Sequence, residues 1–476
     1  MEAGLQDKLH RTPSDALAGI VHLGLGAFFR AHGAIYVAEA MAASGGDWGV
    51  IGVSLKSPGT RDKLRPQGWA YTAVELAPTG ERPQVVTVLR DVLVAPEDPQ
   101  AVLDAMADPA IRIVSLTVTE KGYCHEPSTG RLNRNHPDID HDLTNLLPQS
   151  APGFIVRALA ARRAAGTAPF TVLCCDNLPE NGRVLRGVVL ELAELIDLDL
   201  AAWIKSEVRF PSTMVDRIVP ATSAQDIDRV AELTGVRDEA PVMHEPFRQW
   251  VVEDDFVNGD RPDLGAVGVQ LVQNVTPFEH MKLRMLNGTH STLAYLGYLA
   301  GHDTIAATMA DPVFPAFVKD LWRSEIIPAL TPPEGVDLVA YADALHDRYA
   351  NPSIQHRTWQ IAMDGSQKLP QRILGTIAEG QAAGRAMSGL TLAVAAWMRY
   401  VSGRDLAGQM IEVKDPLADT LADLWRDDPA ETVAGFLALQ QVFPAALRQD
   451  AGFANDLAKA LTGLMDQGAA AAVEHV

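Results

Sequence analysis

The chain has 476 residues, 47% of them hydrophobic, and a formal net charge of -20 at pH 7. This length suggests two or three domains, and the apolar content is ample to build their cores. The acidic balance argues against nonspecific attraction to nucleic acid or to an anionic membrane, since both require a basic surface. An anionic small-molecule substrate would therefore need a local cluster of Arg and Lys.

The cysteines and the apolar runs indicate the cellular compartment. Cys124, Cys174 and Cys175 show neither a disulfide framework nor zinc-ligand spacing. Residues 1–19 hold no apolar run of signal-peptide length, and the longest apolar runs are too short to span a bilayer. We therefore expect a cytoplasmic enzyme. The 13 histidines form no close cluster with Asp or Glu, so no catalytic metal is expected.

Strand-like runs alternate with helical patterns in the N-terminal half. A short apolar run over residues 19–23 ends in Gly24-Leu25-Gly26 and leads into a helical pattern over residues 30–36. Further strand-like runs cover residues 48–53, 84–89, 111–118 and 170–174, and helical patterns cover residues 99–107 and 153–165. The alternation predicts an α/β fold with a Rossmann-like, doubly wound, largely parallel sheet.

The glycine turn after the first strand is a candidate dinucleotide site. In such units the pyrophosphate is held by backbone N–H groups where the helix begins. Phe29 stands where the usual fingerprint has a third glycine, so an ordinary tight turn fits the same residues. The second strand ends in Val53-Ser54 with no carboxylate for a ribose 2'-hydroxyl, so the residues leave the choice between NAD and NADP open.

Helical periodicity replaces this alternation from about residue 278. It covers residues 283–300, 314–327, 338–349, 369–382, 388–401, 416–426 and 431–443, and residues 469–473 are expected to be a frayed tail. We place the boundary near residues 275–277. This predicts a Rossmann-like dinucleotide-binding domain over residues 1–277 and a mostly α-helical substrate and catalytic domain over residues 278–476. A boundary of this kind is a common place for a small-molecule cleft.

The start of the second domain carries a lysine, a carboxamide and an imidazole in an apolar helical stretch. At about 100° per residue, His290 lies about 80° and Asn287 about 140° from Lys282, so all three share one side of an α-helix. A desolvated lysine can remove the hydroxyl proton of an alcohol before hydride leaves, and the other two can hold the oxygen. A solvated helix-start lysine and a core histidine fit the same spacing, which has little intrinsic specificity.

Several separate motifs carry a resemblance to a known family. They are residues 24–32 (GLGAFFRAH), 117–123 (TVTEKGY), 175–182 (CDNLPENG), 214–218 (MVDRI), 245–250 (EPFRQW) and the lysine stretch, residues 281–290. On these residues the chain resembles the polyol-specific long-chain dehydrogenases, the mannitol dehydrogenase family. The resemblance runs over about residues 20–400.

The resemblance implies metal-independent hydride transfer with NAD. It implies that Lys282 is the general base, that Asn177 and Asn287 stabilise the developing oxyanion, and that His290 binds the substrate. The expected cofactor-binding residues are Gly24, Gly26, Ala27, Phe28, Arg30, Ser54, Thr119 and Glu120.

Two acidic residues of the family motifs have open roles. Glu279 matches a residue of the proton path to solvent, and a solvated acid where the helix begins fits equally well. Asp216 lies in a motif near the active site, and a buried partner of Arg217 is the alternative.

Residues 356–372 resemble the uronate-reducing branch of the family. A keto-uronate carries a carboxylate that a neutral sugar lacks, so its site should contain cations. We expect substrate binding by Arg357 and Lys368, with Arg372 and Arg248 behind them, although each alone could be a surface or structural charge.

The expected reaction is reversible, NAD-linked reduction of D-fructuronate to D-mannonate. The alternatives are tagaturonate reduction, a polyol 2-dehydrogenase acting on mannitol or a related sugar alcohol, and a dinucleotide-binding sensor without turnover. The expected partner is a small sugar acid or sugar alcohol, and the residues do not indicate an oligomeric state.

Overall fold

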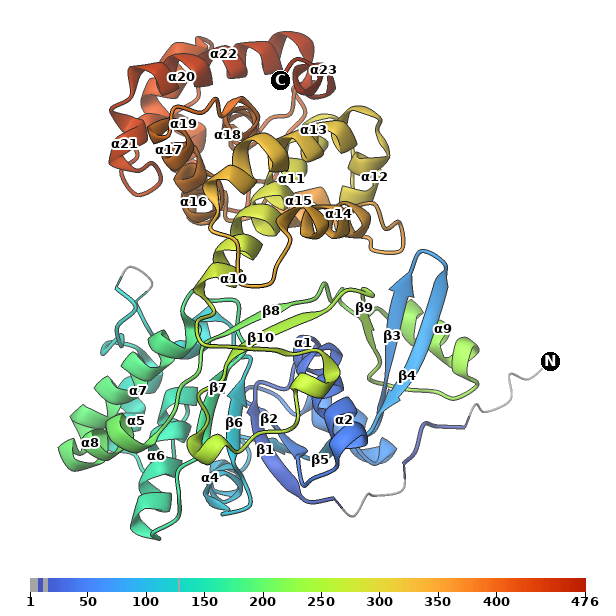
Figure 1. Ribbon diagram of the computed structural model, residues 1–476, viewed down its shortest axis with the longest axis vertical. Coiled ribbons are helices and arrows are strands. Elements are labelled where there is room, and N and C mark those ends of the chain that lie inside the picture. Colours follow the sequence, from blue (N-terminus) through green and yellow to red (C-terminus); the bar gives the residue numbers. More distant parts are fainter. Residues whose placement is uncertain (1–6, 12–15, 127–128) are drawn as a thin grey trace. The chain divides into compact units, whose positions relative to one another are not determined.

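The computed structural model describes residues 7–11, 16–126 and 129–476, so part of the segment examined for a signal peptide lies outside it. The chain divides into two compact units, Met1–Thr276 and Pro277–Val476 (Figure 1). Across the described residues, no helix combines the length and the apolar character that a bilayer crossing requires.

The first unit is built around a five-stranded sheet in the order β5-β2-β1-β6-β7. Its strands are β1 (Ala18–Leu23), β2 (Gly49–Ser54), β5 (Leu89–Val94), β6 (Ile113–Leu116) and β7 (Thr171–Cys174). All four neighbouring pairs are parallel. The chain adds strands on one side of β1 and then crosses to β6 on its other side. The carboxyl ends of β1 and β6 therefore form the switch point at which α/β proteins bind ligands.

Both faces of this sheet are covered, which explains why its strands are nearly continuous apolar runs. Successive side chains of β1 point to opposite faces, so Ile20 and Val21 belong to two different apolar cores. The core around Val21 includes side chains of α4, α6, α7 and α8, and the core around Ile20 includes α2 and the small sheets. The helices of this unit are α1 (Ala27–Ala31), α2 (Gly33–Ser44), α3 (Gly59–Leu64), α4 (Pro99–Ala107), α5 (Pro137–Thr144), α6 (Ala151–Ala164), α7 (Asn181–Ile196), α8 (Leu198–Glu207) and α9 (Ala224–Thr234). The predicted fold class is confirmed.

Two predicted elements of the first unit are wrong in detail. The strand expected over residues 84–89 is the end of one strand and the start of another, because β4 (Gly80–Val86) pairs with β3 (Tyr71–Ala77) in a separate sheet. The helix expected over residues 30–36 is broken at His32, whose backbone leaves the helical region. Its Nε2 forms a hydrogen bond of 2.9 Å with the Gln249 carbonyl, which holds the break in place.

Two three-stranded sheets were not predicted. Their orders are β4-β3-β9 and β11-β10-β8, and the remaining strands are β8 (Thr213–Asp216), β9 (Val242–His244), β10 (Gln249–Glu253) and β11 (Gln270–Val272). The strands β8 to β11 are short and pair with partners far away in the chain, so local alternation is a weak signal for them, whereas β3 and β4 are longer and pair with each other as chain neighbours.

The second unit is helical throughout. Its α-helices are α10 (Thr276–Met281), α11 (Thr289–Leu299), α12 (Ile305–Ala310), α13 (Val313–Leu321), α14 (Leu338–Tyr349), α15 (Thr358–Ile361), α16 (Gly365–Leu369), α17 (Gly375–Ala382), α18 (Ser388–Val401), α19 (Ala418–Asp423), α20 (Pro429–Leu437), α21 (Ala445–Arg448), α22 (Ala451–Gln467) and α23 (Ala469–Glu474). The central helix α18 is buried from Gly389 to Val401 and packs against α11 and α22. A helix that is apolar all round belongs inside such a bundle.

The second unit differs from the expectation in three respects. Residues 469–473 do not form a frayed tail but lie in α23, where Ala469, Ala472 and Val473 are buried against the bundle. The long helix α22 was not predicted. The helices expected over residues 283–300, 314–327 and 369–382 each contain a π-helical segment: Lys282–Gly288, Trp322–Ile326 and Pro370–Leu374.

A buried histidine ties β1 to β6 close to the switch point. His22 forms hydrogen bonds with the side-chain oxygens of Ser115 (2.8 Å) and Thr117 (2.9 Å) and stacks on Phe29. Burial lowers the pKa of His22 to about 3, so the ring is uncharged in the folded protein at neutral pH.

Acidification should destabilise the fold in part through His22. The folded protein holds this ring neutral, whereas the unfolded chain binds a proton below a pKa of about 6.5. The stabilisation is complete above that pKa and is lost as the pH falls from it toward 3, by at most about 1.4 kcal/mol per pH unit. Thermal unfolding at pH 7.5 and 5 should show a smaller loss of stability in His22→Gln, which keeps two hydrogen-bonding ends but does not titrate. An equal loss in both proteins would contradict the assignment.

Candidate active site

The glycine turn after β1 lies at the switch point and needs glycine at its first position. Gly24 has φ of 89°, and a Cβ there would lie 2.2 Å from the Thr117 carbonyl oxygen. Gly26 is the N-cap of α1, and Ala27 and Phe28 are the first two residues of this helix. Arg30 is buried, and its guanidinium donates to the Ala240 carbonyl, which is a structural contact that the sequence did not reveal.

The other expected cofactor residues lie at the same edge of the sheet. Ser54 ends β2 and is buried. Thr119 and Glu120 follow β6, and Thr119 has the unusual backbone angles φ 64° and ψ 162°. Asn177 follows β7, the neighbour of β6, and its side chain is exposed. The parallel strands therefore bring Thr119 and Asn177 to one edge, as strand ends of a parallel sheet must.

Two expected substrate residues of the first unit are held within it. Asp216 is the buried last residue of β8. Arg217, considered as its partner, donates to the carbonyls of Ala31 (2.7 Å) and Glu245 (3.1 Å). Arg248 forms an ion pair with Glu39.

In the second unit, the stretch that carries the candidate base is not the regular α-helix that we expected. Lys282, whose residue is 8% exposed, begins the π-helical segment Lys282–Gly288, and His290 lies in α11 beyond it. A π turn closes i→i+5 hydrogen bonds, so the angles derived for an α-helix do not hold here. Asn287 is half-buried within the segment, and Glu279 is half-buried in α10.

Two aromatic side chains donate to carbonyls of this π-helical segment. Trp322 Nε1 lies 3.1 Å from the Met285 oxygen, and Tyr349 OH lies 2.7 Å from the Leu286 oxygen. Carbonyls that a widened turn leaves poorly paired are costly when buried, so these donors stabilise the segment. π turns are frequent at functional sites.

His290 is a buried ring on which several cations of the second unit act electrostatically. Its residue is 8% exposed, and its ring centroid lies 4.7 Å from that of His356 and 5.3 Å from that of Tyr349. Burial lowers the pKa of His290 well below its ordinary value, and electrostatic interactions with His356, Arg372, Arg348 and Lys368 lower it further. The ring is therefore neutral. Among the described residues, its Nε2 has no hydrogen-bond partner, as expected of an atom that receives a substrate hydroxyl.

Three of the cations expected from the sequence belong to the second unit. Arg372 donates to Ser291 Oγ at 3.1 Å, and Lys368 Nζ donates to the Met363 carbonyl at 2.6 Å. Both act electrostatically on His290. Arg357 is exposed at the N-cap of α15.

Sequence reasoning missed Arg348 and His356. Arg348, 7% exposed, lies in the last turn of α14, where a single arginine reads as an ordinary surface charge. Arg284, considered as a neighbour that lowers the pKa of the lysine, instead forms an ion pair with Glu379.

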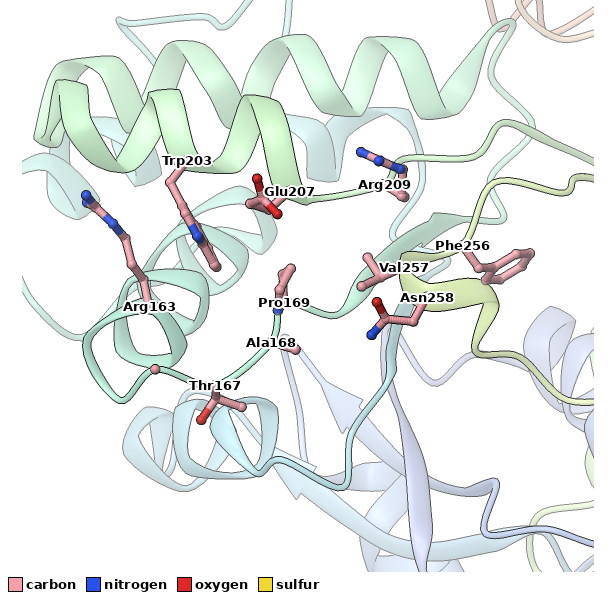
Figure 2. A pocket seen from close by; sticks show the side chains of 11 residues that line it. Arg163, Thr167, Ala168, Pro169, Trp203, Glu207, Arg209, Phe256, Val257 and Asn258 are labelled. Atoms are coloured by element: carbon pink, nitrogen blue, oxygen red, sulfur yellow. The ribbon is translucent and has the colours of Figure 1, made fainter.

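The first unit has two other features that the sequence did not indicate. A hollow of about 500 Å³ has a lining that includes Trp203, Arg209 and the residues just before β7, at the amino end of the sheet and not at the switch point (Figure 2). Ligand atoms of Cys124, His136 and Asp138 lie within 4.8 Å of one another. Burial raises the pKa of the Cys124 thiol to about 12, which opposes the thiolate that a metal would require.

Comparisons with known proteins agree over nearly the whole chain. Residues 18–265 match the mannitol dehydrogenase Rossmann domain, and residues 274–465 match the mannitol dehydrogenase C-terminal domain. D-mannonate oxidoreductase of Escherichia coli K12 is 46% identical over 459 residues, with 94% of each chain covered.

Two solved structures share the fold. Mannitol 2-dehydrogenase of Pseudomonas fluorescens, solved with NAD and D-mannitol, is 39% identical with a TM-score of 0.85, covering 98% of this chain and 96% of its own. A D-sorbitol dehydrogenase in substrate-free form is 32% identical with a TM-score of 0.90, covering 98% and 97%.

Tyr349→Phe should weaken the π-helical segment. The change removes the hydrogen bond to the Leu286 carbonyl, at a cost of about 1 kcal/mol in the free energy of unfolding, and should reduce kcat because Lys282 and Asn287 belong to this segment. The matched control is Tyr295→Phe, which removes a buried hydroxyl that donates to the Ala362 carbonyl at 3.0 Å. Denaturant unfolding and steady-state kinetics should show similar stability losses but a kcat loss in Tyr349→Phe alone. Equal kcat values would assign Tyr349 to stability only.

Proposed function

The chain belongs to the mannitol dehydrogenase family, whose members are NAD-dependent oxidoreductases acting on CH–OH groups, and from this premise we propose that it interconverts D-fructuronate and D-mannonate. The observation that carries the proposal is the group of cations around the neutral His290 in the second unit. The 46% identity to D-mannonate oxidoreductase supports the same choice.

The substrate class follows from the charge around His290. Arg348, Arg372 and Lys368 all act electrostatically on its ring, in a chain whose formal net charge is -20. Gathering like charges is costly unless an anion offsets them, and a keto-uronate brings a carboxylate that can accept charge-assisted hydrogen bonds. Arginine also matches the planar, two-oxygen shape of a carboxylate. A keto-uronate would add its own carboxylate to the contacts that these cations make within the chain, of which the Lys368–Asp364 ion pair at 3.9 Å is one, and a neutral sugar would not.

The residues of the second unit can supply the proton chemistry. NADH, when bound, supplies the hydride to the keto carbon of the substrate. In reduction, protonated Lys282 gives its proton to the keto oxygen, and in oxidation the neutral amine takes the hydroxyl proton. Lys282 is buried within the second unit, which limits the access of water to this residue.

The carboxamides and the imidazole hold the reacting oxygen and its neighbour. We assign to Asn287 and Asn177 the donation of hydrogen bonds to the oxygen as it gains charge. Neutral His290 can donate to one hydroxyl and accept from another through its two ring nitrogens. Glu279 retains its role as a candidate for passing protons between Lys282 and solvent.

Cofactor binding is assigned to the first unit. The Gly24 turn and the residues after β6 lie at the switch point of the parallel sheet, where dinucleotides bind. Ser54 at the end of β2 and the exposed Lys56 beyond it present no carboxylate to the ribose. Comparison of initial rates with NADH and NADPH measures how strictly the enzyme selects NAD.

Lys282→Ala should reduce turnover by about 10²- to 10⁴-fold and leave the Kd for NADH nearly unchanged, because the general base is lost while the glycine turn is intact. Steady-state kinetics and fluorescence titration of NADH measure the two quantities. Lys319→Ala, at an exposed lysine of α13, is the control and should change neither. Turnover that survives in Lys282→Ala would show that another group handles the proton.

Fructuronate should be reduced with a higher kcat/KM than tagaturonate or fructose, and Arg372→Met should raise KM for the uronates by about 10- to 100-fold with little change for fructose. Assays of NADH oxidation with the three ketoses provide the measurement. Ser291→Ala is the matched control, because it removes the hydrogen bond to Arg372 and keeps the charge. A preference for fructose would identify a polyol 2-dehydrogenase, the activity suggested by the likeness to mannitol 2-dehydrogenase. Absence of turnover with every ketose would favour a dinucleotide sensor.

A further inference from the structure

Asp176 joins the ends of β6 and β7. Its Oδ1 accepts a hydrogen bond from the Thr119 N–H at 2.9 Å, and its Oδ2 accepts one from the Val118 N–H at 2.8 Å. The hydroxyl of Tyr123 donates to Oδ2 at 2.6 Å. A single carboxylate thus receives three donors from the segment that follows β6.

The backbone that Asp176 holds is strained. Thr119 has φ 64° and ψ 162°, a region that β-branched residues rarely adopt. A strained conformation persists only where its surroundings determine it. The consecutive N–H groups of Val118 and Thr119 both point at the two oxygens of Asp176, so relaxation of Thr119 would cost hydrogen bonds to a charged acceptor.

The position of the carboxylate is itself fixed from two sides. Tyr123 is fully buried, and its hydroxyl also lies 2.6 Å from Cys174 Sγ, at the end of β7. The buried Asn181 donates to the Asp176 carbonyl at 2.9 Å and to the Thr213 carbonyl at 2.8 Å, which ties the loop to β8. In the chain, Asn177 lies between Asp176 and Asn181, which these hydrogen bonds hold in place.

Burial raises the pKa of Asp176, and the hydrogen bonds from Tyr123, Val118 and Thr119 oppose that rise. These three donors favour the ionised carboxylate, which can only accept hydrogen bonds.

We propose that Asp176 is a positioning residue that sets Thr119 and Glu120 in the conformation that binds NADH and sets Asn177 in the conformation that stabilises the oxyanion. The proposal rests on the roles proposed above for these residues. Asp176 acts through its neighbours and need not touch substrate or cofactor.

Asp176→Asn tests the proposal with the shape of the side chain retained. The amide loses the charge and turns an NH₂ group toward one of the three donors, so the strained turn should relax. We expect the Kd for NADH to rise about tenfold and kcat to fall by about tenfold or more. The first quantity is measured by NADH fluorescence without any sugar, and kcat is measured with the ketose that gives the best rate. A wrong substrate assignment therefore leaves the NADH result unaffected.

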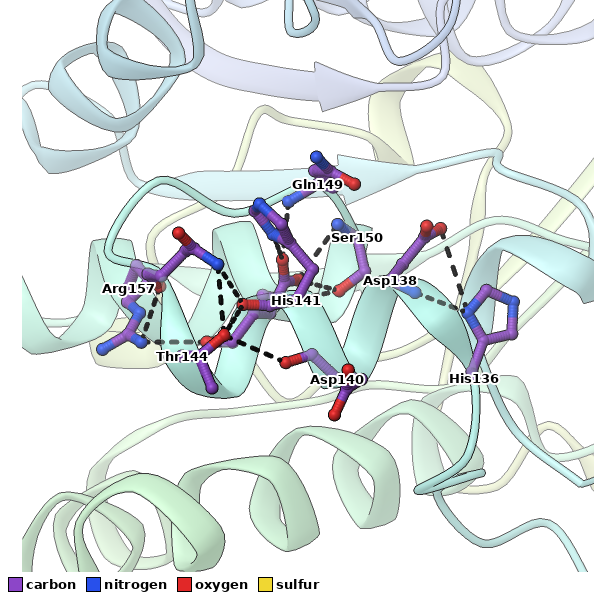
Figure 3. Close-up of polar contacts among 11 residues, drawn as sticks. His136, Asp138, Asp140, His141, Thr144, Gln149, Ser150 and Arg157 are labelled. Atoms are coloured by element: carbon purple, nitrogen blue, oxygen red, sulfur yellow. Dashed lines mark hydrogen bonds and ion pairs between the residues drawn. The ribbon is translucent and has the colours of Figure 1, made fainter.

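Asp142→Asn is the matched control. Asp142 is buried in α5, and its carboxylate accepts hydrogen bonds from the Gln149 N–H (2.7 Å), the Ser150 N–H (3.0 Å) and the Ser150 hydroxyl (2.5 Å), as the contacts around Gln149 and Ser150 in Figure 3 show. Like Asp176 it accepts two backbone N–H groups and one hydroxyl, with His141 Nδ1 as a further neighbour at 3.0 Å, but it has no assigned part in the reaction. We expect a lowered Tm with Kd and kcat within about twofold of the wild type.

The proposal is overturned if Asp176→Asn lowers Tm as Asp142→Asn does and leaves both the NADH Kd and kcat unchanged, because that result describes a purely structural carboxylate. If Asp176→Asn does not fold, Tyr123→Phe takes its place, since it removes one donor to Asp176 and keeps the buried ring. We then expect a smaller rise in the NADH Kd, about two- to fivefold, and an unchanged Kd would overturn the proposal equally.

Discussion

The uncharged state of His290 is the condition on which the candidate site of the second unit depends. Arg348, Arg372 and Lys368 already place positive charge near this ring, and a protonated imidazole would add to their repulsion. Because burial keeps the ring neutral, His290 adds no positive charge of its own to theirs. The imidazole can then take part in hydrogen bonding without competing for a substrate carboxylate.

In the first unit, polar loops are held in place at the end of an apolar sheet. The strands β1, β6 and β7 are buried, and the residues that follow them carry the polar groups. Two side chains fix these loops: His22 between β1 and β6, and Asp176 between β6 and β7. Each is buried or nearly so, and both ring nitrogens of His22 and both carboxylate oxygens of Asp176 have hydrogen-bond partners, which is the condition under which a polar group stabilises a core. The loops therefore have defined conformations beside the strand ends.

The sequence predicted the features that depend on local pattern. The buried strands of the main sheet read as apolar runs because helices or small sheets cover both faces, and Gly24 was recognisable because its turn tolerates no Cβ. The boundary between β4 and β5 was missed because two strands of different sheets stand almost adjacent in the chain. Helical periodicity indicated the second unit but could not separate α-helical from π-helical turns.

Residues whose importance comes from tertiary contacts escaped prediction. Arg348 resembles an ordinary surface charge in the sequence, and His356 stood in a quoted motif without a role of its own. The ring contact of His356 with His290 and the electrostatic effect of Arg348 on that ring are visible only in the structure. Asp176 was quoted within a motif, yet the strained backbone of Thr119 that it holds is visible only in the structure. The side chains of Trp322 and Tyr349, which donate to the π-helical segment, come from helices far along the chain.

Because of that π-helical segment, the relative orientation of Lys282 and His290 depends on the number of residues between them as well as on the residue types. A π turn holds about one residue more than an α turn, so every side chain after it is rotated by about 100° relative to an uninterrupted α-helix. A relative that lacked one residue between these positions could keep the lysine, the carboxamide and the imidazole and still present them in a different relative orientation. In such a chain the same three residue types would be present in the sequence, but their side chains would not be arranged as they are here.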